Sequence, residues 1–323
     1  MEQLKGRTAV LTGGGTGMGR ELARQLAAAG CNVAMCDVSA RNMEQTRTLC
    51  EADAPTDVRV TTHLADVSRE SDVQGFRDEV MREHEVECVH FVFNNAGIAG
   101  AGSFVADDRE SWERTFNVCW YGVYYSTRAF LPLLIAADRG HLVNTSSVNG
   151  FFATGGVLPH TAYSTAKFAV KGFTEGLITD LAINAPHVKV SLVMPGYVGT
   201  SILANSARVL GNEPHTLADD DLEALRERYE RRGSDLTNLT TEEIRQMMLS
   251  EFESFRDDAP MNAAEAARVI IEAVLAGRWR ILVGDDAHVL DEMVRAEPEE
   301  AYTPEFYERM RARMFVSVPK LGL

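Results

Sequence analysis

Short apolar runs alternate with amphipathic helical patterns along the chain as far as Pro195. The runs lack the in-and-out alternation of half-exposed strands, which is typical of parallel strands covered on both faces. We expect strands at Thr8–Leu11, Asn32–Cys36, Val58–His63, Val89–Phe93, His141–Asn144 and Val188–Val193, and helices at Arg20–Ala29, Arg41–Ala52, Ser71–His84, Ser111–Ala137 and Ala162–Ala185. This order predicts consecutive βαβ units and a doubly wound parallel α/β sheet, which binds ligands at the carboxyl ends of its strands.

Two local signals refine these elements. Gly30 follows the first predicted helix, where a C-terminal cap favours a residue with positive φ. Pro132 lies inside the Ser111–Ala137 helix and is expected to kink it, because proline removes a helical hydrogen bond.

The pattern changes after Thr200. Leu222 and Leu225, and later Ile244 and Met248, recur at helical spacing in an acidic segment. The letters Thr240-x-x-Glu243 and Asn262-x-x-Glu265 predict two capped helix starts, the second helix ending near Gly277. We therefore interpret residues 201–260 as a helical substrate cover inserted into one domain that spans residues 1–323.

Arg280–Val283 is expected to be the last strand of the sheet. Residues 285–323 form a proline-containing, acidic extension. Two interpretations of it are equally supported by the sequence. It wraps a neighbouring surface, or it is loosely ordered.

Composition narrows the possible partners. The 32 basic and 47 acidic residues give a net charge of −15, which repels polyanions and argues against nucleic acid and anionic membranes. The five cysteines show no metal-ligand spacing, and the histidines are scattered, so no metal site is expected. Free thiols and the absence of an apolar leader or spanning segment predict a cytoplasmic protein.

A glycine-rich turn joins the first strand to the first helix, with the sequence Thr12-Gly13-Gly14-Gly15-Thr16-Gly17-Met18-Gly19. Strand, glycine turn and helix in succession place backbone N–H groups against a pyrophosphate, which makes this a Rossmann-type dinucleotide site. Asp37 ends the second strand, where a carboxylate accepts the ribose hydroxyls of an adenosine and repels a 2′-phosphate. With Val38 next and no basic residue in the turn, the sequence favours NAD over NADP.

Further motifs follow in order: Asn94-Asn95-Ala96-Gly97, Asn117, Ser146-Ser147 and Tyr163-x-x-x-Lys167. With the glycine turn, they make residues 5–200 resemble the classical short-chain dehydrogenase/reductase family. The resemblance implies cofactor contacts in addition to those of the glycine turn and Asp37, at Val38, Asp66, Val67, Asn95, Ala96, Gly97, Tyr163, Lys167, Pro195, Gly196, Val198 and Thr200. It implies Asn117, Ser147, Tyr163 and Lys167 as the catalytic residues.

Residues at i and i+4 share one face of a helix, so Tyr163 and Lys167 can meet at one reacting group. A tyrosine is a poor base at neutral pH, and we expect Lys167 and the nicotinamide charge to lower the pKa of Tyr163. The resemblance assigns Ser147 to the substrate oxygen and Asn117 to a water that connects Lys167 with solvent.

The Phe151–His160 loop is longer than is usual in the family, so either Ser146 or Ser147 could face the substrate, and we choose Ser147. The loop is apolar and contains glycine. It would line a pocket for a hydrophobic substrate, although a buried clamp would have the same composition.

The sequence thus predicts an NAD(H)-dependent oxidoreductase that interconverts a small hydrophobic secondary alcohol and its ketone. The alternatives are an epimerase or dehydratase of the wider superfamily and a non-catalytic NAD-binding regulator. The resemblance also implies a homotetramer or homodimer that pairs the helices at Ser111–Ala137 and Ala162–Ala185 between subunits.

Overall fold

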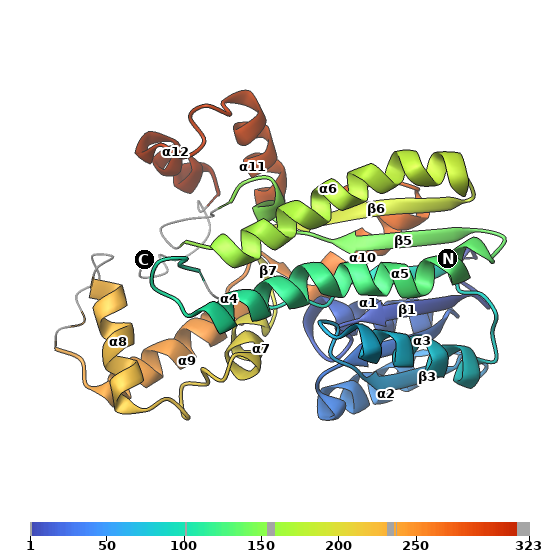
Figure 1. The fold of residues 1–323 in the computed structure, drawn as a ribbon, viewed down its shortest axis with the longest axis horizontal. Helices are drawn as coiled ribbons and strands as arrows, with labels where there is room; N and C mark the ends of the chain where they lie inside the picture. The colour runs from blue at the N-terminus through green and yellow to red at the C-terminus, as the bar shows by residue number, and fades with distance from the viewer. Residues whose placement is uncertain (1, 101, 154–158, 231–235, 237, 315–323) are drawn as a thin grey trace.

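A seven-stranded parallel sheet forms the centre of the protein in the computed structural model (Figure 1). The structure describes residues 2–100, 102–153, 159–230, 236 and 238–314. The strand order is β3-β2-β1-β4-β5-β6-β9, and the strands are β1 (Thr8–Thr12), β2 (Asn32–Asp37), β3 (Val60–Leu64), β4 (Phe91–Asn94), β5 (Gly140–Thr145), β6 (Val188–Pro195) and β9 (Arg280–Val283). The predicted α/β doubly wound fold is confirmed.

Helices cover both faces of the sheet, which is why its strands are apolar throughout. One face is packed by α1 (Gly17–Ala28), α2 (Ala40–Asp53) and α10 (Ala263–Leu275), with residues such as Leu26 and Ile270 in the core. The other face is packed by α3 (Glu70–His84), α5 (Gly122–Ile135) and α6 (Thr161–Asn184), with Phe76, Phe130 and Leu177 in the core.

The sheet reverses its strand order between β1 and β4, which are paired directly. In a doubly wound sheet such a reversal leaves a crevice at the carboxyl ends of the two strands. The glycine-rich turn follows β1 and the Asn95-Ala96-Gly97 segment follows β4, so both motifs lie at this crevice.

The predicted Ser111–Ala137 helix consists of three parts. It begins with α4 (Arg109–Phe116), continues through the π-helical turn η1 (Asn117–Tyr121) and ends as α5. The irregular turn lies at Asn117–Tyr121, whereas Pro132 stays inside α5. A π-helical turn changes the direction in which the neighbouring side chains point, and such turns are frequent at functional sites.

Most element boundaries agree with the predictions to within two residues, and the Gly30 backbone has the expected positive φ of 84°. The first helix differs, because it begins at Gly17 rather than Arg20. Because glycine has a low helix propensity, the sequence did not indicate that the helix begins inside the glycine-rich turn. The packing of Gly19 against the Gly13 carbonyl overrides that preference.

Residues beyond Thr200 form helices at one end of the sheet, with a small second sheet of β7 (Val198–Gly199) and β8 (Met261–Asn262) (Figure 1). The helices are α7 (Ile202–Val209), α8 (Asp219–Glu230) and α9 (Thr241–Asp257). Both predicted capping boxes are present, one at the start of α9 and one at the start of α10.

The C-terminal extension contains α11 (Asp285–Ala296) and α12 (Pro304–Met314). Leu290, Phe306 and Met310 of these helices are buried together with Phe152. The Phe152 ring lies 5.1 Å from the Tyr302 ring and 5.7 Å from the Phe306 ring, measured between centroids. The described part of the extension therefore packs on the protein, as the first of the two interpretations expected.

Candidate active site

The glycine-rich turn is held in shape by glycines that no larger residue could replace. Gly13 and Gly17 have positive φ angles of 73° and 54°. A Cβ on Gly19 would lie 1.9 Å from the Gly13 carbonyl oxygen, so only glycine allows α1 to start this close to the turn. The side chain of the N-cap residue Thr16 does not cap α1, which leaves its first N–H groups for an anion.

Asn95 fixes the turn to the end of β4. Its Nδ2 donates to the carbonyl oxygens of Thr12 at 3.2 Å and Gly13 at 3.4 Å. The Thr12 hydroxyl in turn accepts from the backbone N–H groups of Asn95 and Ala96. These bonds set the width of the crevice between β1 and β4.

Asp37, the last residue of β2, lies against the glycine-rich turn on the side of Gly15. Its carboxylate accepts from the backbone N–H of Gly15 and from that of Ser39, each at 3.0 Å. Burial raises the pKa of Asp37, and these N–H groups act in the opposite direction. Arg20 lies close enough to Asp37 to favour its charged form and donates to the Gly15 carbonyl at 2.7 Å. A cation therefore lies behind the turn, which the sequence reasoning had not expected.

Asp66 forms an ion pair with Arg114 at 2.8 Å and accepts from Ser68. Its Oδ2 is thereby directed toward Arg114 of α4. A Cβ on Gly122 would lie only 2.8 Å from Cγ2 of Val67, the residue after Asp66. Gly122 thus lets α5 pack closely against Val67.

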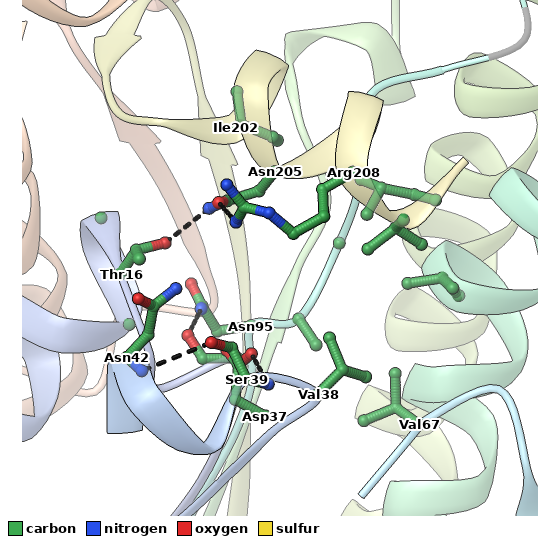
Figure 2. Close-up of a pocket in the computed structure, with 18 of the residues that line it drawn as sticks. Thr16, Asp37, Val38, Ser39, Asn42, Val67, Asn95, Ile202, Asn205 and Arg208 are labelled. Atoms are coloured by element: carbon green, nitrogen blue, oxygen red, sulfur yellow. Dashed lines mark hydrogen bonds between the residues drawn. The ribbon is translucent and has the colours of Figure 1, made fainter. Parts of the chain in front are cut away.

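These walls enclose a cavity of about 530 Å³ (Figure 2). Most of the predicted cofactor residues line it: Gly13, Thr16, Gly17, Met18, Gly19, Asp37, Val38, Asp66, Val67, Asn95, Ala96, Gly97 and Thr200. Pro195, Gly196, Val198, Tyr163 and Lys167 lie outside this lining. Gly196 is instead pressed against Asp286, whose Oδ2 accepts from the Tyr197 N–H at 2.6 Å. This contact fixes the turn after β6.

Tyr163 and Lys167 lie on one face of α6, with Lys167 Nζ 5.4 Å from the centre of the Tyr163 ring. Lys167 is buried, and its ammonium donates to the Thr145 carbonyl at 3.0 Å. A Cβ on Gly97, which lines the cavity, would lie 3.5 Å from Nζ. The pair therefore lies next to the cavity, at its β4 end.

The two serines after β5 have different partners. Ser146 Oγ donates to the Lys167 carbonyl at 2.7 Å and so anchors α6. Ser147 lies close enough to Tyr163 to act on the pKa of its phenol in the lowering direction, and its hydroxyl accepts from the Asn149 N–H at 3.1 Å. The structure thus brings Ser147, the residue chosen from the sequence, against Tyr163.

Burial raises the pKa of the Tyr163 phenol well above its ordinary value, while Ser147 acts in the lowering direction. Burial also lowers the pKa of Lys167. The expected lowering depends on the charge of a bound nicotinamide as well as on Lys167, and in the protein alone the burial of the phenol dominates.

Asn117 is the first residue of the η1 turn, which packs against α6, the helix that carries this pair. The role that the resemblance implies for Asn117, holding a water beside Lys167, stays a prediction. Cys119, two residues after Asn117, is buried beside Lys167, and its thiol contacts the Ile98 carbonyl at 3.2 Å. If Gly97 had a Cβ, that atom would lie 3.8 Å from the Cys119 sulfur as well as 3.5 Å from Lys167 Nζ. The sequence could not reveal this, because the π-turn shifts which residues face α6.

Sequence reasoning also missed part of the cavity wall. The additional lining residues are Ser39, Asn42, Ala65, Ile98, Arg114, Val118, Ile202, Asn205, Arg208 and Val209. Four of these come from α7 at helical spacing, and that spacing was the available signal. Residues 154–158 of the loop expected to line a substrate pocket lie outside the described residues.

Comparison with known proteins agrees with this geometry. The model of the short chain dehydrogenase family matches residues 7–209. The oxidoreductase SadH of Mycobacterium tuberculosis is 32% identical over 91% of this chain and 92% of its own length. Epidermal retinol dehydrogenase 2 of Mus musculus is 33% identical over 62% of this chain and 63% of its own length.

Among solved structures, a short chain dehydrogenase/reductase of Burkholderia phymatum in complex with NAD superposes with a TM-score of 0.72. It is 25% identical, and the match covers 94% of this chain and 98% of that chain. Other matching structures carry NADP or 5-hydroxy-NADP, so the solved neighbours include complexes with either kind of nicotinamide cofactor. The chain belongs to the short-chain dehydrogenase family of oxidoreductases.

Proposed function

We propose that this protein is an NAD(H)-dependent oxidoreductase that interconverts a hydrophobic secondary alcohol and its ketone, with Tyr163 as the acid and base. The observation that carries the proposal is the position of Tyr163, Lys167 and Ser147 directly beside the cavity that follows the glycine-rich turn. Family membership supports the reaction class, and the residues define where it takes place.

The residues of the cavity fit a dinucleotide. The uncapped start of α1 and the close approach at Gly13 and Gly19 suit a pyrophosphate, and Asp37 suits ribose hydroxyls. Asp37 also supports NAD over NADP, because its carboxylate repels a 2′-phosphate. Arg20 weakens this repulsion only in part, since its guanidinium is bonded to Gly15 and Thr46.

In this mechanism Ser147 holds the substrate oxygen and Tyr163 exchanges a proton with it. The raised pKa keeps Tyr163 protonated at neutral pH, so the protein's own groups prepare it to donate a proton to a ketone oxygen. A bound nicotinamide supplies the hydride donor or acceptor and, when oxidised, a positive charge that favours the phenolate. Lys167, beside the ring, adds to that effect whenever it is protonated.

A hydrophobic substrate is supported by the name of a relative. One relative of the chain is named a retinol dehydrogenase, and retinol is a hydrophobic alcohol. In the described part of the Phe151–His160 loop, Phe152 is buried against Phe306 of α12. The Phe152 packing supports the clamp interpretation for this residue of the loop.

A panel of hydrophobic secondary alcohols with NAD⁺, and of the matching ketones with NADH, tests the proposal. We expect net formation or consumption of reduced nicotinamide, followed by its absorbance. Product formation without any net nicotinamide change would favour the epimerase or dehydratase alternative. Tight NAD binding with no turnover across the panel would favour the non-catalytic regulator.

We also propose that the protein self-associates through the outer faces of η1, α5 and α6. Trp120, Tyr121 and Tyr124 form a ring cluster there with Phe173, and Tyr121 and Phe168 are exposed. Light scattering should give the mass of a dimer or tetramer, and a monomer mass would contradict this.

A cytoplasmic location remains our proposal. It is supported by the five free cysteines, Cys31, Cys36, Cys50, Cys88 and Cys119, which suit a reducing compartment. Across the part of the chain that the structure describes, there is no helix with the length and apolar character needed to cross a membrane.

A further inference from the structure

One face of α7 forms the wall of the cavity opposite the second strand. Ile202, Asn205, Arg208 and Val209 line the cavity from this helix. Figure 2 shows Ile202, Asn205 and Arg208 on one side, with Asp37, Val38 and Ser39 on the other. A ligand lying along the glycine-rich turn would therefore be enclosed between the turn and α7.

Hydrogen bonds fasten α7 across the cavity at two points. Asn205 Nδ2 donates to the Thr16 hydroxyl of the glycine-rich turn at 2.8 Å. On the β4 side, the Ala99 N–H donates to the hydroxyl of Ser206, a buried residue, at 2.8 Å. Arg208, one helical turn beyond Asn205, is thereby held at a defined place above the turn.

The guanidinium of Arg208 is oriented by its neighbours. Nη1 donates to Asn205 Oδ1 at 3.2 Å, and Nε donates to Glu213 Oε1 at 3.1 Å. Among the residues that the structure describes, Nη2 has no hydrogen-bond partner. The Arg208 side chain is 55% exposed, so this edge is accessible to a ligand.

The charges around the cavity distinguish Arg208 from the other lining arginine. Arg114 is paired with Asp66 and bonded to Ser68. Asp37 and Asp66 contribute negative charge to the cavity. A pyrophosphate carries two negative charges of its own, and the turn itself supplies only N–H groups and a helix dipole. Among the described lining residues, Arg208 is the cation beside Thr16.

We propose that Arg208 binds the pyrophosphate of the dinucleotide from the α7 side and so completes the phosphate site that the glycine-rich turn begins. Arg208 is a cofactor-binding residue that the sequence motifs do not contain. The inference rests on the proposed function, because it takes the cavity to be the dinucleotide site.

Isothermal titration of the full-length protein with three ligands tests this inference. NADH and ADP-ribose contain the pyrophosphate, whereas adenosine does not. In Arg208→Gln we expect dissociation constants for NADH and ADP-ribose to rise by about tenfold or more, since a charge-assisted hydrogen bond is lost, while adenosine binding stays the same. The matched control is Arg268→Gln, because Arg268 is exposed to a similar extent and pairs with Glu272 on α10, outside the cavity lining.

Equal binding of NADH by Arg208→Gln and the unchanged protein would overturn the inference and leave the proposed function standing. Failure of the unchanged protein to bind NADH or ADP-ribose would overturn both. Weaker binding of NADPH with unaltered binding of NADH would also overturn the inference, because Arg208 would then contact a 2′-phosphate.

Glu213→Gln separates phosphate binding from a purely structural role. If Arg208 only fastened α7 through Glu213, this variant would weaken NADH binding as much as Arg208→Gln does, which would contradict the inference. We expect the opposite, unchanged or tighter binding of NADH, because the substitution frees Arg208 from an acidic partner. The salt dependence of NADH binding should be smaller in Arg208→Gln than in Glu213→Gln.

Discussion

The Asp37 carboxylate accepts a hydrogen bond from the Gly15 N–H, so the end of β2 and the glycine-rich turn form one wall of the cavity. A negative charge is thus fixed where the adenosine ribose of a dinucleotide is expected. The same bond orients the carboxylate and leaves lone pairs for ribose hydroxyls.

Asp37→Asn is expected to reduce the preference for NAD over NADP, because it removes the charge that repels a 2′-phosphate. The ratio of kcat/KM for NAD⁺ to that for NADP⁺ should fall by about tenfold or more, as one lost charge repulsion allows. Asp53→Asn is the control, since it makes the same charge change at a surface pair with Arg24. An unchanged ratio in Asp37→Asn would show that this carboxylate does not select the cofactor.

Cys119→Ala and Asn117→Ala compare the residue that lies beside Lys167 with the one that the resemblance implies. The Cys119 thiol is buried beside Lys167, whereas Asn117 is expected to hold a water there. We therefore expect Asn117→Ala to reduce kcat by about tenfold or more, and Cys119→Ala to change kcat by less than about twofold. A larger loss in Cys119→Ala than in Asn117→Ala would contradict the role that the resemblance implies for Asn117.

Because His141 is buried, we expect the folded protein to lose stability in acid. His141 is buried on β5, its Nε2 lies 2.7 Å from the Ser191 hydroxyl, and burial lowers its pKa from 6.5 to about 4. The unfolded chain binds a proton below pH 6.5 while the folded protein does not, so this stabilisation is complete above pH 6.5 and decreases as the pH falls toward 4. Between pH 7 and 5 the loss amounts to roughly 2 kcal/mol of unfolding free energy.

Urea unfolding at these two pH values measures the effect. His141→Gln should lose less stability on acidification than the unchanged protein, whereas His215→Gln, at an exposed position, should lose the same amount. His84, whose pKa burial also lowers to about 4, keeps its contribution in both variants. Parallel losses in His141→Gln and the unchanged protein would disprove the assignment.

The sheet was predictable because its strands are buried on both faces, so runs such as Val33–Cys36 carry no polar interruption. The starts of α9 and α10 were predictable because a capping box is local chemistry. In contrast, the η1 turn and the place of Cys119 depend on how α4 and α5 pack against α6 and the Gly97 segment. No local preference in the sequence encodes that packing.

The same limit applies to the cavity. The glycines and Asp37 follow their strands directly, so their positions follow from the order of the elements. Arg208 is far from them in sequence and reaches the cavity because α7 is fastened to Thr16 through Asn205 and to Ala99 through Ser206. The burial that raises the pKa of Tyr163 in the protein alone is a further property that the spacing between Tyr163 and Lys167 does not encode.

The central claim is that Tyr163 exchanges the substrate proton beside a bound nicotinamide, and Tyr163→Phe tests it most directly. Turnover of an alcohol with NAD⁺ and the dissociation constant for NADH should be measured on the same preparation. We expect turnover to fall by about 10²–10⁴-fold, the usual contribution of a general acid or base, while NADH affinity is nearly unchanged. Turnover close to that of the unchanged protein, with NADH still bound, would contradict the account.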